Sequence, residues 1–109
     1  MKLIFSIVQD EDASRLVSNL MNEGFGVTKL ATTGGFLRAG NTTLIIGVED
    51  DKVGSAMVII EKICKSRRQI ATSPSPVAGA TGVYVPYPIE VMVGGATVFV
   101  IDVEQFHKI

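Results

Sequence analysis

The sequence predicts an α+β fold in which two helices pack on one face of an antiparallel sheet. Short apolar segments and two amphipathic helical patterns follow one another in the order strand, helix, strand, strand, helix, strand. Hydrophobic residues make up 47% of the 109 residues, which is enough for a buried core. This length suggests a single domain over residues 1–109.

The first strand and the first helix come from the beginning of the chain. Residues 2–8, KLIFSIV, carry apolar side chains on both faces and predict an interior strand. The acidic segment QDEDAS then starts a helix, and Gly24 is a suitable residue to end it. The core-facing stripe expected for this helix consists of Ala13, Leu16, Val17, Leu20 and Met21.

A hairpin and a second helix follow. Residues 25–33 and 41–49 predict two strands that pair with each other. Asp50 and Asp51 start the second helix, and helical spacing continues to about Arg68. Its expected apolar stripe consists of Val53, Ala56, Met57, Ile60, Ile63 and Cys64.

The last part of the chain predicts a long loop and a second hairpin. Residues 66–82 are rich in Pro, Ser, Thr, Ala and Gly without a clear period, which indicates an irregular loop. Residues 89–93 and 96–103 predict a β-hairpin that turns at Gly94 and Gly95. The complete order predicts a ferredoxin-like βαββαβ fold with an additional C-terminal strand. Its sheet face opposite the helices is apolar, and the same face of another subunit is the simplest cover, which predicts a homo-oligomer.

Composition and charge exclude several classes of protein. Ten basic against eleven acidic residues provide no positive field for long nucleic acids. No apolar run approaches the roughly 20 residues of a membrane span, and the opening segment turns acidic too early for a signal peptide. Cys64 is the single cysteine, so no internal disulfide forms, and a cytoplasmic location is expected.

Catalytic and metal-binding patterns are scarce. His107 is the only histidine and lies in the terminal segment, while Cys64 falls on an apolar helical stripe. The segment 65–68, KSRR, is interpreted as a solvated helix end rather than an anion site. No His, Cys and Asp spacing suggests a metal. We therefore expect no catalytic residue, no metal and no cofactor.

One turn, TTGGFLRAGNTT at residues 32–43, carries the strongest functional signal. As an ordinary hairpin loop, its glycines would supply positive φ and its threonines would favour strands. However, Phe36 and Leu37 would then be exposed at its tip. Glycine N–H groups can bind an anion, Asn41 can bond a purine edge, and an aromatic ring can stack on a base. The turn therefore favours a nucleotide site, although it is neither a P-loop nor a Rossmann glycine motif.

Three segments carry a family resemblance: IVQDED at 7–12, TKLATTGGFLRAGNTT at 28–43 and PYPIEVMVGGATVFV at 86–100. Through them nearly the whole chain resembles the PII-like cyclic di-AMP receptor proteins of bacteria. The resemblance implies a homotrimer of ferredoxin-like subunits that binds cyclic di-AMP in the clefts between neighbours. It also implies a short T-loop at about 34–41 and a long B-loop at about 67–87.

The same resemblance implies a set of ligand-binding residues: Thr28, Gly35, Phe36, Leu37, Asn41, Gly47 and Phe99. The two phenylalanines and the leucine would pack against adenine. Asn41 and the Gly47 backbone would hydrogen-bond the base, and Thr28 would hold phosphate. Relatives commonly carry Arg where this chain has Gly26, so a charge-assisted phosphate contact is missing and Arg38 is the expected substitute.

The function implied is a non-enzymatic signalling receptor that relays cyclic di-AMP to an unknown downstream protein by loop rearrangement. One alternative is a PII-type regulator that binds ATP or another adenine nucleotide and controls a transporter or an enzyme. Basic residues for a triphosphate cluster only at 65–68, which disfavours it. A second alternative, an enzyme that uses His107 and the 66–82 loop, has no placed general base.

Overall fold

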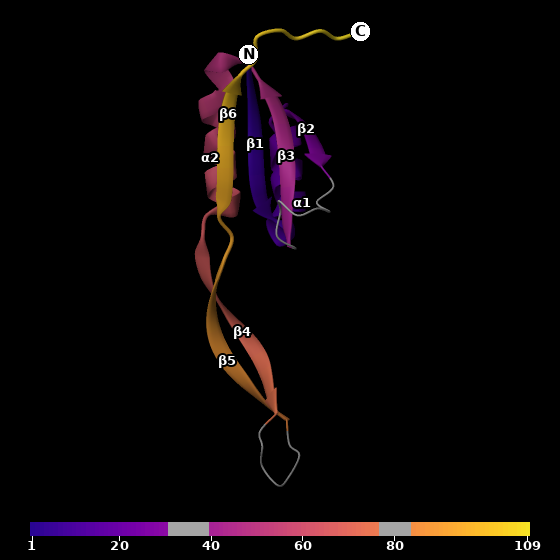
Figure 1. Ribbon diagram of the computed structural model, residues 1–109. Coiled ribbons are helices and arrows are strands. Elements are labelled where there is room, and N and C mark those ends of the chain that lie inside the picture. The colour runs from indigo at the N-terminus through magenta and orange to yellow at the C-terminus, as the bar shows by residue number, and fades with distance from the viewer. Residues whose placement is uncertain (31–39, 77–83) are drawn as a thin grey trace.

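A four-stranded antiparallel sheet covered on one face by two helices forms the body of the protein (Figure 1). The structure, a computed structural model, describes residues 1–30, 40–76 and 84–109. The strand order is β2-β3-β1-β6, which is the ferredoxin-like order expected from the sequence. The elements of the body are β1 (Lys2–Gln9), α1 (Asp10–Asn22), β2 (Gly26–Leu30), β3 (Asn41–Val48), a 3-10 turn (Asp50–Lys52), α2 (Val53–Cys64) and β6 (Ala96–Asp102).

The core lies between the helices and the sheet. Side chains of α1 and α2 pack there on alternate residues of β1 and β3, such as Ile4 and Leu44. The predicted stripes supply this core, including Cys64, but Met21 is 60% exposed and the prediction for it was wrong. Met21 follows Leu20 by one residue, so it lies about 100° further around the helix and points past the packed face. The buried residues are Ile4, Val8, Ala13, Leu16, Leu20, Leu44, Ile46, Val48, Ala56, Ile60 and Cys64.

Two predicted local features are confirmed. Gly24 has φ of +89° and ends α1 in a Schellman motif, in which Phe25 donates to the Leu20 carbonyl at 2.9 Å. β2 and β3 pair as an antiparallel hairpin, with Thr28 opposite Ile45. Residues 31–39, between these strands, lie outside the described part of the chain.

The prediction of an irregular loop over residues 66–82 was wrong for its first half. Residues Arg67–Pro76 form β4, which pairs with β5 (Tyr84–Val93) in a two-stranded ribbon that projects from the body (Figure 1). Helix α2 consequently ends at Cys64 rather than near Arg68. The prolines in this segment argued against a strand. They are tolerated because each strand of a two-stranded ribbon has one free edge, where a proline without an N–H breaks no hydrogen bond between strands. Residues 77–83 lie outside the described ranges.

The hairpin predicted at Gly94 and Gly95 was also wrong. β5 pairs with β4, whereas β6 pairs with β1, so the two glycines connect two different sheets. The terminal strand β6 is therefore the fourth strand of the body, and the additional strands are β4 and β5, which precede it. Both glycines have positive φ, and they redirect the chain past the end of α2 instead of reversing it.

The root of the ribbon is fixed to the β1–α1 junction by polar contacts. Arg67, the first residue of β4, donates to the carboxylate of Asp12 at 2.8 Å, and Asp12 is only 1% exposed. Gly94 donates its N–H to the side-chain oxygen of Gln9 at 2.7 Å, and Gly95 donates to the Cys64 carbonyl. Both strands of the ribbon are thus attached at one end of the sheet.

We expect Gly94→Ala to destabilise the protein more than Gly95→Ala. Both glycines have positive φ, but only a Cβ at Gly94 would lie 2.8 Å from the Lys65 carbonyl oxygen. We expect Gly95→Ala to lower the free energy of unfolding by about 1 kcal/mol and Gly94→Ala by about 3 kcal/mol. Urea denaturation measures both values. Equal losses would contradict the close packing of Gly94 against α2.

Candidate functional site

Two neighbouring hollows open on the sheet face that the helices leave uncovered. They share Ile7 on the central strand β1, so they lie next to each other along the sheet. The first, of about 340 Å³, lies at the end of the sheet near the ribbon root. The second, of about 380 Å³, lies further along β1 and β6. We define these two hollows and the strand residues around them as the open face.

The hollow at the sheet end is mainly polar. Gln9 and Asn41 lie opposite each other on β1 and β3, and Thr97 lines the hollow from β6. Gly94 and Gly95 complete the wall with backbone groups, which a ligand can approach closely because glycine has no side chain. This combination of two carboxamides, a hydroxyl and bare backbone can bind hydrogen-bonding ligands such as a base edge.

The start of β3 is held firmly beside this hollow. Asp10 donates its backbone N–H to the Gly40 carbonyl at 2.8 Å, and its carboxylate accepts a hydrogen bond from the Thr42 hydroxyl. Asn41 lies between these two contacts, so its backbone position is determined by the β1–α1 junction. A side chain placed in this way needs little reordering to bind a ligand.

The second hollow is mainly apolar. Phe5 and Phe99 face each other across β1 and β6, and Ile101 extends the apolar surface along β6. Phe99 is 54% exposed, which is unusual for a large aromatic side chain in a sheet. The described residues of the chain do not cover this surface, so it is available to a planar apolar ligand, a neighbouring subunit, or both.

The four described residues expected to bind ligand lie on the open face but are spread over it. Thr28 and Phe99 belong to one cross-strand row, at opposite edges of the sheet and about 14 Å apart. Asn41 and Gly47 share a face of β3 but lie six residues, or about 20 Å, apart. Within one subunit, Asn41 and Gly47 therefore cannot contact the same base.

Gly47 forms a patch of bare backbone with Gly26. The two glycines are cross-strand neighbours on β2 and β3, and a Cβ at either position would meet nothing within 4 Å. Gly26 lies on the same face as Thr28, two residues away on β2. Gly26 thus opens directly onto the region where Thr28 is expected to bind phosphate.

The remaining expected binding residues cannot be placed. Gly35, Phe36, Leu37 and Arg38 lie outside the described residues. Leu30 on β2 and Gly40 before β3 flank residues 31–39. Both lie at the end of the sheet that holds the polar hollow.

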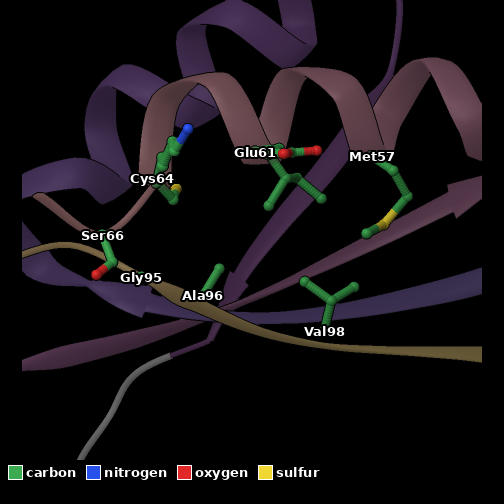
Figure 2. Close-up of a pocket in the computed structure, with 9 residues that line it drawn as sticks. Met57, Glu61, Cys64, Ser66, Gly95, Ala96 and Val98 are labelled. Carbon is green, nitrogen blue, oxygen red and sulfur yellow. The ribbon is translucent and has the colours of Figure 1, made fainter.

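Another hollow, of about 310 Å³, lies between α2 and β6 (Figure 2). Figure 2 shows Met57, Glu61 and Cys64 on the helix side of this hollow and Ala96 and Val98 on the strand side. Burial, together with the negative charge of Asp12, raises the pKa of the Cys64 thiol to about 11. The thiol is therefore protonated at neutral pH, which makes it a poor nucleophile and metal ligand.

Within residues 1–30, 40–76 and 84–109, no three His, Cys, Asp or Glu residues are grouped so that they could bind a metal ion. His107 contacts Gln105 in the terminal segment, away from the hollows. Over the same ranges, no helix combines the length and the apolar character that a membrane crossing requires.

Sequence patterns alone missed two residues that shape the site. The sequence pattern indicated Gln9 only as part of the acidic segment that starts α1. In the structure, Gln9 lines the polar hollow and accepts a hydrogen bond from Gly94. Arg67 was assigned to a solvated helix end, but it pairs with the buried Asp12, whose carboxylate raises the pKa of the guanidinium. Gln9 could have been identified because it is a polar residue at the last position of an otherwise apolar strand.

Comparisons with known proteins agree with this fold. A family model described as "Cyclic-di-AMP receptor" matches residues 1–109, the whole chain, which confirms the resemblance seen in the sequence. The chain is also similar to the crystal structure of a functionally unknown protein from Pediococcus pentosaceus ATCC 25745. The two share 42% sequence identity with a TM-score of 0.78, over 99% of this chain and 96% of that one.

We expect the Cys64 thiol to react slowly in the folded protein. With a pKa of about 11 instead of 9.0, the thiolate fraction at pH 8 is about a hundredfold lower. Alkylation by iodoacetamide, followed by mass spectrometry, should be slower by at least this factor than in denaturing urea, and should accelerate as the pH rises toward 11. Equal rates in both conditions would contradict the burial of this side chain.

Proposed function

Because the chain belongs to the cyclic-di-AMP receptor family, we propose that it binds cyclic di-AMP on the open face of its sheet, in clefts between the subunits of a homotrimer. The observation that carries this proposal is the family match over all 109 residues. The family is one of receptors, and the proposed role is signalling without catalysis. The buried, free Cys64 supports a location in the reducing cytoplasm.

The exposed apolar surface supports assembly into a trimer. Phe99, Val100 and Ile101 are all substantially exposed on β6, beside the half-buried Phe5 and Ile7 of β1. Apolar surface of this kind is normally covered in a stable protein, and a symmetric oligomer covers it with copies of itself. In the proposed trimer, the ligand and the neighbouring subunit together cover the open face.

The spread of the proposed binding residues supports a ligand with two bases. Asn41 and Gly47 of one subunit lie about 20 Å apart on β3, which is too far for a single adenine to contact both of these residues in the same subunit. Cyclic di-AMP carries adenines on two sides of its sugar–phosphate ring. One adenine could therefore reach the polar hollow at Asn41 while the other lies near the Gly26–Gly47 patch. ATP, the ligand of the alternative regulator, has only one base.

The β4–β5 ribbon supports the proposed relay to a partner. We propose that residues 34–41 are the T-loop and residues 67–87 the B-loop, and that ligand binding rearranges both. The ribbon projects from the body (Figure 1). Ile70 and Met92 are exposed, and the strand register puts them on the same face of the ribbon. Such a surface is suited to contact a downstream protein once its position has changed.

Calorimetry with cyclic di-AMP and ATP, side by side, tests this function. We expect one cyclic di-AMP per subunit and weak or absent ATP binding. Light scattering should give a mass three times the 11.6 kDa of one chain. Chromatography of the ligand after long incubation should return cyclic di-AMP unchanged. Tight binding of ATP but not cyclic di-AMP would favour the PII-type regulator instead.

We expect Asn41→Ala to weaken cyclic di-AMP binding by about tenfold or more without unfolding the trimer. The substitution removes a side chain that can form two hydrogen bonds to an adenine edge, a contact worth about 1–3 kcal/mol. Calorimetry measures the affinity, and light scattering measures the assembly. The same measurements apply to Phe36→Ala, which should weaken binding similarly by removing the side chain expected to stack on adenine. Asn22→Ala, at the exposed end of α1, is the matched control. Wild-type affinity in Asn41→Ala would refute base recognition by this residue.

We expect Gly26→Arg to tighten cyclic di-AMP binding by about ten- to a hundredfold. The new side chain enters open space beside Thr28 and adds a charge-assisted bond to phosphate, worth about 1.5–3 kcal/mol. Gly26→Met provides a control of similar length without charge. If both variants bind as the wild type does, the phosphates are already fully satisfied or lie elsewhere.

A further inference from the structure

Gln9 joins the polar hollow to the root of the ribbon. It is the last residue of β1, lies opposite Asn41 in the sheet, and lines the hollow together with it. Its side-chain oxygen also accepts the N–H of Gly94 at 2.7 Å. Gly94 is the residue at which the chain leaves β5 and turns toward β6. One side chain is therefore in contact with both the proposed ligand site and the ribbon.

A second link lies three residues further along the chain. The carboxylate of Asp12 accepts hydrogen bonds from Arg67 at 2.8 and 3.3 Å, at the start of β4. Arg15 also lies 3.6 Å from this carboxylate. Because Asp12 is 1% exposed, a ligand in the hollow cannot reach it, and separating the pair would leave a buried charge. This link is suited to act as a fixed pivot.

The Gln9 link differs from this pivot in its chemistry. A carboxamide has one oxygen acceptor and two N–H donors, and here the oxygen is used by Gly94. Among the described residues, none accepts a hydrogen bond from these donors, which can therefore bind a ligand that offers an acceptor, such as a purine ring nitrogen or a phosphate oxygen. Since the carboxamide is planar and rigid, a ligand that draws the NH₂ group toward itself must also move the oxygen, and with it the bond to Gly94.

The backbone around Gly94 can transmit this movement. Gly94 lies so close to α2 that even a Cβ atom would approach the Cys64 and Lys65 carbonyl oxygens to 3.0 and 2.8 Å. Gly95 is tied to α2 by its hydrogen bond to Cys64. The β5 end of the ribbon therefore cannot slide freely along the helix. Because Arg67 is held by Asp12, a displacement of Gly94 would turn the ribbon about the Asp12–Arg67 contact.

Resting on the function proposed above, we infer that Gln9 is the positioning residue that couples occupancy of the Asn41 hollow to the orientation of the β4–β5 ribbon. The ligand is bound through the NH₂ group of Gln9, and the ribbon responds through its oxygen and Gly94. The Asp12–Arg67 pair stays intact in both states. The response of the ribbon is then controlled by a single side chain, whose NH₂ group contacts the ligand and whose oxygen contacts Gly94.

Hydrogen exchange of the ribbon amides, measured by mass spectrometry with and without saturating cyclic di-AMP, tests this coupling. In the wild-type protein we expect ligand to change exchange in β4 and β5 by about fivefold or more, the size of one ordinary hydrogen bond. Calorimetry on each variant confirms that it is saturated under the conditions used.

Two substitutions separate coupling from a merely structural role. Gln9→Glu keeps an oxygen for Gly94 but has no NH₂ group, so the Gly94 amide should stay protected while the ribbon no longer responds to ligand. Gln9→Ala removes both the oxygen and the NH₂ group. The Gly94 amide should then exchange faster, and the ribbon should again not respond to ligand. Gln105→Ala, in the terminal segment, is the matched control and should respond as the wild type does.

A ribbon that responds to ligand in Gln9→Glu as it does in the wild type would overturn the coupling role of Gln9. So would a wild-type ribbon whose exchange does not change although calorimetry shows bound cyclic di-AMP. In that second case the proposed function would stand and only the coupling would fall. Absence of cyclic di-AMP binding to the wild-type protein would overturn both.

Discussion

The buried carboxylate of Asp12 is the constraint on which the arrangement of the two sheets depends. It lies in the first turn of α1, next to core residues such as Ala13, where an unpaired charge would be strongly unfavourable. Arg67 provides the matching positive charge, and Arg67 is also the first residue of β4. The chain must therefore begin its ribbon beside α1 and cannot extend α2 beyond this point. An ion pair that would be of little consequence on the surface determines here where the helix ends and where the ribbon starts.

This attachment gives the open face a polar end and an apolar end. Near the ribbon root, backbone amides and carboxamides gather around Asn41, whereas aromatic and aliphatic side chains dominate toward Phe99. A dinucleotide has the same duality, since its bases have hydrogen-bonding edges and apolar faces. The fold presents both kinds of surface on the open face, and the family match is to receptors.

The elements that could be predicted from the sequence are those whose signal is local. The apolar segment of β1, the stripe of α1 and the helix stop at Gly24 each depend on neighbouring residues, and the structure confirms them except for Met21 in the stripe. The pairing of β4 with β5 could not be predicted, because prolines hid the first strand and its partner lies across residues 77–83. The positions of Thr28, Asn41, Gly47 and Phe99 on one face follow from strand alternation. The distance between Asn41 and Gly47 follows from their spacing on one strand, whereas the distance between Thr28 and Phe99 does not, because it depends on the strand order.

The independence of the ribbon has a consequence for how such receptors diversify. Its two strands contact chiefly each other, and the hydrophobic core lies wholly within the four-stranded body. Residues inserted in pairs, one in each strand, lengthen the ribbon while every side chain keeps its face. Neither the core nor the open face constrains such insertions. Selection can therefore alter the length of the protruding arm while the open face stays unchanged.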